Sequence, residues 1–118
     1  MLNLVVVRSA NPAQLVAFYQ ALGLTFKQHQ HGDGPEHWAC EEGAVVFEIY
    51  PLREGQTATK SLRLGFRVAS VADAVTQATG VGARLVSAPQ MSEWGLRAVI
   101  ADPDGNRVEL TEPPRTEG

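Results

Sequence analysis

Apolar and polar positions along the chain change period from block to block, and these changes mark the expected strands and helices. The first block, residues 2–8, is rich in β-branched valine and predicts a strand. An apolar stripe at helical spacing follows in four positions: Leu15, Phe18, Tyr19 and Leu22. With Asn11 as a suitable N-cap and Pro12 at the first helical position, residues 12–22 are predicted to form a helix that packs on a sheet.

The rest of the chain is divided by turn residues into further strands and one more helix. Ser70 can cap a second helix, whose apolar stripe runs to Ala78 before Gly80 ends it. Asp-Pro-Asp-Gly-Asn at 102–106 is a strong turn signal, whereas the polar stretch 51–60 lacks periodicity and indicates a linker. The remaining strands are expected over 24–30, 37–41, 44–50, 62–68, 84–87, 95–101 and 107–111.

The same plan of strand, helix and three strands is therefore written twice. A shift of 59 residues, half of the length of 118, makes the element boundaries coincide. Accidental similarity between two ordinary strand–helix units is the alternative. We predict one domain over 1–118, with a first module at about 1–51, a linker at 52–60, a second module at about 61–112 and a frayed tail at 113–118.

Composition excludes several classes of protein. The chain has 118 residues, 44% apolar residues and a net charge of −3, which suits one globular domain and not a disordered segment. Its ten basic residues are scattered along the sequence, so nucleic acid is not an expected partner. No apolar run approaches the length of a membrane span, and the first residues do not resemble a signal peptide. The single Cys40 cannot form an internal disulfide, so we predict a structural thiol and a cytoplasmic protein.

Three segments together resemble the vicinal oxygen chelate superfamily, which includes glyoxalase I, bleomycin-resistance proteins, fosfomycin-resistance enzymes and extradiol dioxygenases. They are RSANPAQLVAFYQALGL at 8–24, AVVFEIY at 44–50, and WGLRAVIADPDGNRVEL at 94–110. The resemblance implies an α+β fold in which two βαβββ modules form a partly open mixed barrel around a cavity. It also implies a homodimer and a small-molecule ligand.

The resemblance also implies where a metal ion would bind. Glyoxalase-like members place one ligand on the first strand and one on the last strand of each module. Glu48 and Glu109 match the last-strand positions, but the first-strand positions hold Leu4 and Arg63, which cannot ligate a metal. We therefore predict no bound metal, and we expect Arg63 to pair with Glu48 or Glu109 or to hold the carboxylate of a ligand. A divalent zinc, nickel, manganese or iron ion, if bound, would have only the two glutamates as ligands.

Strand alternation gives the two glutamates a second interpretation that needs no family. Glu48 shares one face of its strand with Val46 and Tyr50, and the other face carries the apolar residues that suit contact with a helix. Glu109 lies on the corresponding face of residues 107–111. Alone, this pattern indicates two glutamates on a solvated face of a sheet. If that face lines a cavity, either carboxylate could serve as a catalytic general base.

Histidine and tryptophan side chains supply the other candidates. His29 and His31 point the same way on a strand, with His37 across a loop, so they either chelate a transition metal or form a solvated hairpin end. His37, Trp38, Trp94 and Tyr50, together with Arg63, are the predicted ligand-binding residues. Burial in the core or in a dimer interface is the alternative for each tryptophan.

Two classes of function follow, and a third is weaker. The first is a metal-free binding protein that sequesters a small amphipathic or cationic molecule. The alternative is a divergent lyase or isomerase, similar to lactoylglutathione lyase, that uses Glu48 or Glu109 as acid or base with or without a divalent metal. The third is a structural partner domain that has lost its activity.

Overall fold

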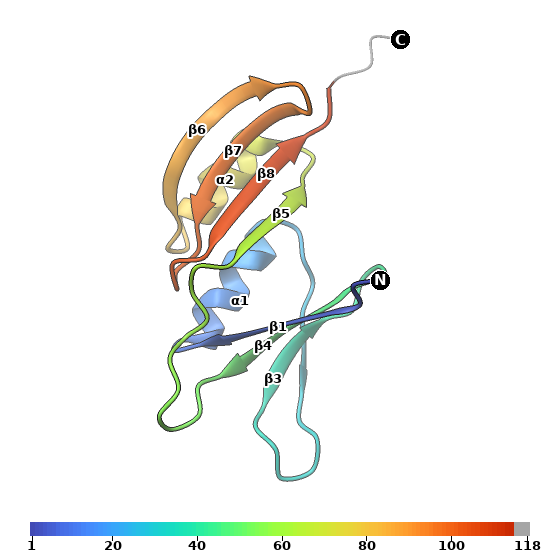
Figure 1. Cartoon of the computed structure of the whole chain (residues 1–118), viewed down its shortest axis with the longest axis vertical. Helices are drawn as coiled ribbons and strands as arrows, with labels where there is room; N and C mark the ends of the chain where they lie inside the picture. The colour runs from blue at the N-terminus through green and yellow to red at the C-terminus, as the bar shows by residue number, and fades with distance from the viewer. Residues whose placement is uncertain (115–118) are drawn as a thin grey trace.

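A computed structural model describes residues 1–114 of the chain, which form two successive modules (Figure 1). Each module consists of one strand, one helix and three further strands. The elements of the first module are β1 (Leu4–Ser9), α1 (Pro12–Ala21), β2 (Lys27–His29), β3 (His37–Cys40) and β4 (Val46–Pro51). Those of the second module are β5 (Arg63–Arg67), α2 (Val71–Thr79), β6 (Arg84–Ser92), β7 (Gly95–Ala101) and β8 (Arg107–Glu112).

Each module contains one four-stranded mixed sheet, with the strand orders β1-β4-β3-β2 and β5-β8-β7-β6. The first strand of each module pairs in parallel with the last, and the other pairs are antiparallel. β1 and β5 are therefore edge strands of two separate sheets. The prediction of two βαβββ modules is confirmed, but the two sheets do not close into a barrel within residues 1–114.

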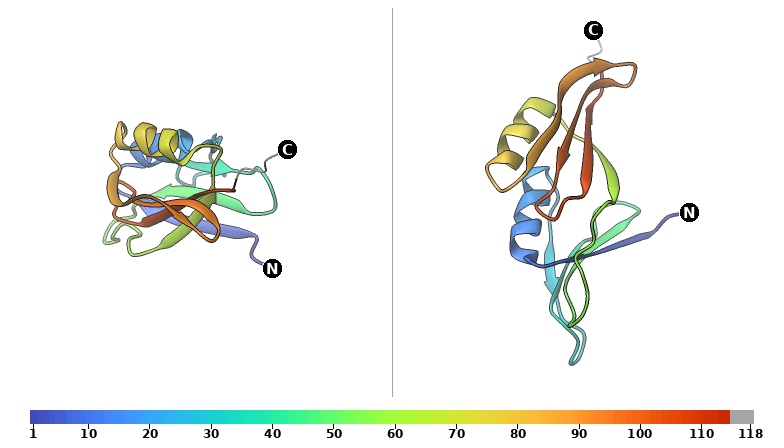
Figure 2. Two further views of the ribbon diagram at one scale, coloured as in Figure 1. Left: turned by 90° about the horizontal axis from the view of Figure 1, so that it is seen from above. Right: turned by 60° about the vertical axis from the view of Figure 1, so that its left-hand side comes forward.

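The helices begin where the sequence places caps. Asn11 Oδ1 accepts a hydrogen bond from the Gln14 backbone amide, and Ser70 Oγ accepts one from that of Asp73. Both helices cover the same side of the molecule, and the sheets form the other side (Figure 2). The apolar residues of β4 and β8 predicted to face the helices are buried there: Phe47, Ile49, Val108 and Leu110. In this article the opposite, helix-free side of each sheet is called its open face.

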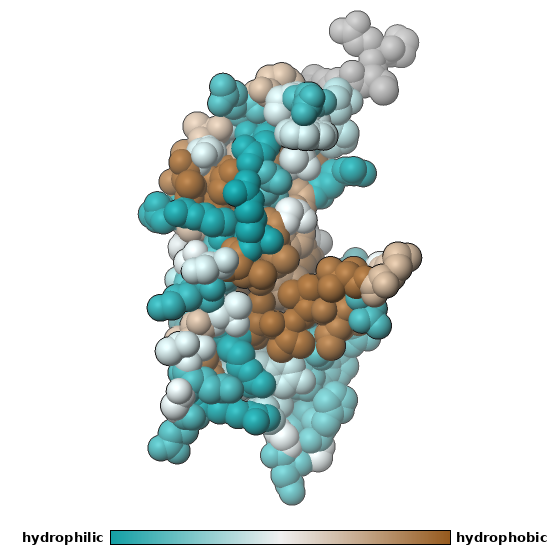
Figure 3. All heavy atoms as spheres, in the orientation of Figure 1, coloured by the Kyte–Doolittle hydropathy of each residue, from teal (hydrophilic) through white to brown (hydrophobic). Residues whose placement is uncertain are grey.

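The modules meet end to end, with α1 against α2, in a molecule that measures 53 × 27 × 24 Å. The segment between β4 and β5 is held to both modules, because the Thr59 hydroxyl accepts from the Arg8 amide and the Thr59 carbonyl accepts from Asn106 Nδ2. Figure 3 shows a hydrophobic band across this junction that continues along the N-terminal segment. Exposed apolar side chains on that segment are Leu2, Leu4 and Val6.

Two strands depart from their predicted bounds by three residues or more. β2 covers only Lys27–His29 and not 24–30. β6 extends to Ser92 and not only to 87, because pairing with β7 continues through its polar end, as Gln90 with Arg97 and Ser92 with Gly95. Of the predicted tail, residues 115–118 lie outside the described part of the chain. No helix among the described residues is long and apolar enough to cross a membrane.

Candidate functional site

The open face of the first sheet carries most of the predicted site residues of the first module. β1 pairs with β4 so that Val6 lies beside Glu48 and Arg8 beside Tyr50. The Arg8 guanidinium carbon lies 4.9 Å from the centre of the Tyr50 ring, a cation–π contact. Two alternate positions on each strand therefore share one face, as the alternation of the sequence predicts.

His37 is the buried member of this face. Its ring stacks on the Tyr50 ring with centroids 4.3 Å apart, and its side chain is 2% exposed. His37 Nδ1 lies 3.3 Å from the Pro35 carbonyl, and Nε2 lies 3.5 Å from Glu48 Oε2. The Nε2 atom is buried and has no hydrogen-bond partner among residues 1–114. A carboxylate and an imidazole are therefore adjacent, and a small movement of Glu48 would bring its oxygen within hydrogen-bond distance of Nε2.

The other two histidines extend this cluster toward the end of β2. The ring centroids of His29, His31 and His37 are 5.2 to 6.1 Å apart, and His29 Nε2 lies 2.8 Å from Glu41 Oε1. The planes of the His29 and His31 rings are nearly parallel, at 6°. Within the described residues, no three histidine, cysteine or carboxylate side chains are arranged to hold a metal ion.

Glu109, on the open face of the second sheet, is held by two arginines. Arg63 Nη2 donates to Glu109 Oε1 at 3.2 Å, and Arg97 donates to the same oxygen through Nε and also contacts it through Nη2. Burial acts to raise the pKa of Glu109, but the hydrogen bonds and charges of Arg97 and Arg63 outweigh it and lower the pKa below its ordinary value. Of the partners predicted for Arg63, which were Glu48, Glu109 or a ligand carboxylate, the structure shows Glu109. Glu109 is an ionised partner of two guanidinium groups and not a free base.

The strand register tests the metal site that the resemblance implies. Glu48 lies beside Val6 in the first module, and Glu109 lies beside Gly65 in the second. Two residues earlier on the first strands stand Leu4 and Arg63, at equivalent positions of the repeat. Neither offers a lone pair, and one is a cation bonded to the only carboxylate of its sheet face. This donor set does not fit a divalent metal ion.

The two tryptophans are placed differently. Trp38 pairs with Ile49 and packs against the core, on the opposite side of its strand from His37. Trp94 lies in the turn between β6 and β7 and is 66% exposed. Glu48 and Glu109 lie on different sheets, and each has partners within its own module. Apart from Trp38, the predicted site residues therefore form two groups within one chain, one in each module.

Trp94 and Glu109 line a hollow of about 710 Å³ at one end of the second sheet. We call it the arginine pocket, after two of its members. It is lined by Arg67, Ser92, Trp94, Arg97, Glu109, Thr111, Pro113 and Pro114. Charged guanidinium groups, hydroxyl groups and one aromatic ring thus meet around a space of the size of a small-molecule site.

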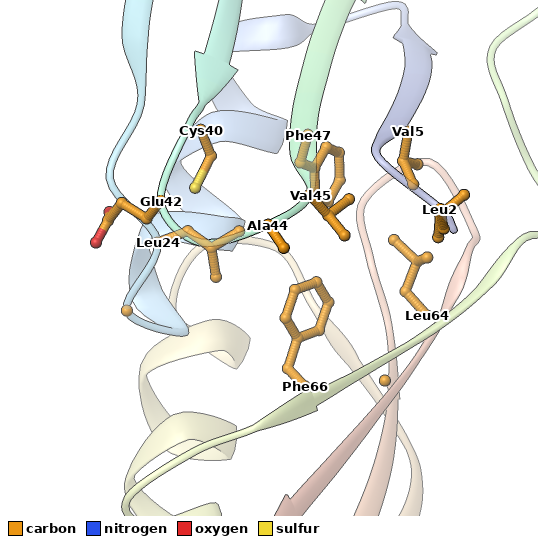
Figure 4. Close-up of a pocket in the computed structure, with 12 residues that line it drawn as sticks. Leu2, Val5, Leu24, Cys40, Glu42, Ala44, Val45, Phe47, Leu64 and Phe66 are labelled. Atoms are coloured by element: carbon orange, nitrogen blue, oxygen red, sulfur yellow. The ribbon is translucent and has the colours of Figure 1, made fainter.

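A second hollow lies between the modules and is almost entirely apolar (Figure 4). This junction cavity measures about 480 Å³. Leu24, Phe47, Leu64 and Phe66 point into it, and the buried Cys40 thiol lies at its side. Its single carboxylate, Glu42, accepts a hydrogen bond from the Thr25 amide. The cavity has the chemistry of incomplete apolar packing and lacks converging polar groups.

Sequence reasoning missed Arg97 and Arg67. Alternation within residues 95–101 puts Arg97 on one face with Val99, but only the pairing of β7 with β8 places it beside Thr111 and next to Glu109. The two arginines stand on strands that are separated by β8, so no local spacing brings them together.

Comparisons with known proteins agree with this architecture. The model of the glyoxalase-like domain family matches residues 4–111. A glyoxalase/bleomycin resistance protein from Albidiferax ferrireducens T118 is similar with a TM-score of 0.76 at 22% identity, over 97% of this chain and 99% of that one. TnmS3, an antibiotic binding protein from Streptomyces sp. CB03234, has a TM-score of 0.73 at 21% identity, over 97% and 96% of the two chains. A glyoxalase I mutant from Zea mays has a TM-score of 0.76 at 17% identity, over 93% of this chain and 46% of that one.

A search of curated protein sequences found no match. The structural similarities, all below 25% identity, establish the fold and no particular ligand. The repeat, the glutamate on the last strand of each module and the match over residues 4–111 agree, and the chain belongs to the glyoxalase-like domain family.

Proposed function

We propose that this protein binds a small molecule without the help of a metal ion. The observation that carries the proposal is the double pairing of Glu109 with Arg63 and Arg97. Two guanidinium groups stand where a divalent cation would have to approach, and Leu4 and Arg63 supply no ligand. The arginine pocket gives such a molecule a place to bind.

A homodimer is part of this proposal. Leu2, just before β1, and Leu4 and Val6 within it expose apolar surface along an edge strand, and neither helix covers the open face of its sheet (Figure 2). Exposed edges and apolar strips of this kind favour association with a second copy. Such a partner would also enclose the ligand more fully than one chain does.

The experiment is metal analysis of the purified protein together with thermal unfolding in the presence of nickel, zinc or manganese. We expect less than stoichiometric metal and an unchanged melting temperature, because the donor set is incomplete. A stoichiometric metal ion, or a large metal-dependent rise in melting temperature, would contradict the proposal. A ligand screen that follows Trp94 fluorescence then tests binding itself, with Trp94→Phe as the control for the origin of the signal.

One observation supports a lyase or isomerase as the second candidate. His37 Nε2 is buried, has no hydrogen-bond partner within residues 1–114 and lies 3.5 Å from Glu48 Oε2. A carboxylate–imidazole pair of this kind can transfer a proton within a site closed off from water. Turnover of the hemithioacetal of methylglyoxal and glutathione, lost in Glu48→Gln, is the test that separates this candidate from the binding protein.

A further inference from the structure

The arginines of the second module are concentrated on one face of one sheet. Five of the ten basic residues of the chain lie on β5, β6, β7 and β8 with their side chains on the open face. They are Arg63, Arg67, Arg84, Arg97 and Arg107. The chain as a whole has a net charge of −3, so this face departs from the average of the molecule.

The register arranges these residues in three rows across the sheet. The first row consists of Arg63, Arg107, Ala101 and Arg84. The third row consists of Arg67, Thr111, Arg97 and Gln90. The middle row consists of Gly65, Glu109, Val99 and Ser87. Apart from the glutamate, the middle row has short side chains, so the long arginine side chains of the outer rows border a shallow depression.

Glu109 cannot neutralise this face. It is the only acidic residue in the three rows, and it pairs with Arg63 and Arg97. Arg67 makes no ion pair with any carboxylate of residues 1–114, and Arg107 Nη1 is buried without a hydrogen-bond partner there. Arg63 and Arg107 stand directly opposite each other, an arrangement of like charges that destabilises a strand pair. The face therefore carries an excess of positive charge, which a bound anion would offset.

The arginine pocket shows what else such an anion needs. Arg67 and Arg97 occupy the same row as Thr111, and Trp94 closes the end of the pocket with a largely exposed indole ring. Guanidinium groups bind carboxylate and phosphate oxygens through paired hydrogen bonds, and an exposed indole stacks on planar rings. Relying on the function proposed above, we propose that the arginine pocket binds a small aromatic anion, with its acidic group between Arg67 and Arg97 and its ring against Trp94.

The charge expected of the ligand is therefore opposite to the one that the acidic composition suggests. The charge of the whole chain favours a cationic molecule, but the local field at the pocket is set by groups within about one Debye length. There the uncompensated charges are positive.

The test is isothermal titration calorimetry of the full chain with four compounds of similar shape. They are naphthalene-1-carboxylate, 1-naphthyl phosphate, naphthalene-1-carboxamide and 1-naphthylmethylammonium. We expect at least one of the two anions to bind about tenfold or more tightly than the neutral amide, and the ammonium compound to bind most weakly. The preferred anion identifies its acidic group as a carboxylate or a phosphate. Affinity for the anion should fall as salt is raised, whereas affinity for the amide should not.

Variants of residues in the arginine pocket test whether the preference for anions arises there. Arg67→Gln should weaken anion binding about tenfold and leave affinity for the amide unchanged, because the exposed Arg67 side chain makes no ion pair within residues 1–114 that the substitution would remove. Trp94→Ala should weaken the anion and the amide alike. Arg53→Gln, which removes an exposed arginine of the linker, is the matched control and should change neither affinity.

Two kinds of failure can be told apart. If the amide or the ammonium compound binds as tightly as both anions, or if Arg67→Gln has no effect on anion binding, the anion proposal is wrong while small-molecule binding stands. If none of the four compounds binds at millimolar concentration, the anion proposal is overturned together with the pocket on which the proposed function relies. An unchanged melting temperature of each variant shows that lost affinity does not reflect unfolding.

Discussion

The Tyr19 hydroxyl donates a hydrogen bond to Asp102 Oδ2 across the junction of the two modules, with an oxygen–oxygen distance of 2.9 Å. Tyr19 belongs to α1 and Asp102 to the turn between β7 and β8, and the two are 1% and 4% exposed. Burial raises the pKa of Tyr19 far above its ordinary value, and the Asp102 carboxylate raises it further. The hydroxyl therefore stays protonated and keeps the two modules connected.

Replacing Tyr19 by phenylalanine should therefore destabilise the whole chain. A hydrogen bond to a buried charged group contributes about 2 kcal/mol, so we expect Tyr19→Phe to lower the free energy of unfolding by about that amount. Urea unfolding followed by circular dichroism measures the change. Tyr50→Phe is the matched control, because the Tyr50 hydroxyl makes no hydrogen bond within residues 1–114. Equal effects of the two substitutions would contradict the role of the inter-module bond.

The carboxyl of Glu109 should titrate below its ordinary value of 4.5. The pKa of Glu109 is lower in the folded state than in the unfolded state. The ionised carboxylate therefore stabilises the fold fully at a pH above the unfolded-state pKa, and this stabilisation is lost as the pH falls through the folded-state pKa. Arg97→Gln should move the pKa back toward 4.5, and Arg84→Gln, on the same face without a contact to Glu109, should not. Carbon-13 NMR of the Glu109 carboxyl measures the titration. An unchanged pKa in Arg97→Gln would contradict the pairing.

The local elements of this fold could be predicted because their signals lie within a few residues. Asn11 and Pro12 start α1, and the 102–106 turn forms because Asp102 Oδ1 accepts from the amides of Asp104 and Asn106. A pair of Arg63 with one of the two last-strand glutamates could be predicted from the family pattern, but the choice of Glu109 over Glu48 needed the strand pairing. Each of these inferences needs only short-range spacing or a repeated motif.

The rest of the site depends on which strands become neighbours. Arg97 reaches Glu109 because β7 lies beside β8, and Arg67 enters the same row only through β8. The burial of His37 results from the Tyr50 ring stacked on it, which the sequence does not place. The cluster of five arginines on one face could not be predicted from the ten scattered basic residues, because residues that are far apart along the chain can lie close together in space.

The proposed homodimer predicts which surface substitutions change the oligomeric state. Val6→Lys should shift the protein from dimer to monomer without loss of fold, because the side chain is 41% exposed in the single chain. Val86→Lys is the matched control on β6, where valine is 37% exposed on the other edge strand of the second sheet. Sedimentation equilibrium measures the mass. A protein that is monomeric without any substitution, or a Val6→Lys variant that stays dimeric, would contradict β1 as the interface.

Filling the junction cavity in one variant and the arginine pocket in another distinguishes which of the two sites binds the ligand. Ala44 is exposed at the apolar cavity, so Ala44→Phe should fill part of it at little cost in stability and leave binding of naphthalene-1-carboxylate unchanged. Thr111→Phe places the same side chain in the arginine pocket and should reduce that affinity about tenfold or more. Calorimetry of both variants compares the two sites directly. The opposite result, with binding lost only in Ala44→Phe, would move the ligand to the apolar cavity, where Phe66 and Leu24 and not the arginines would contact it.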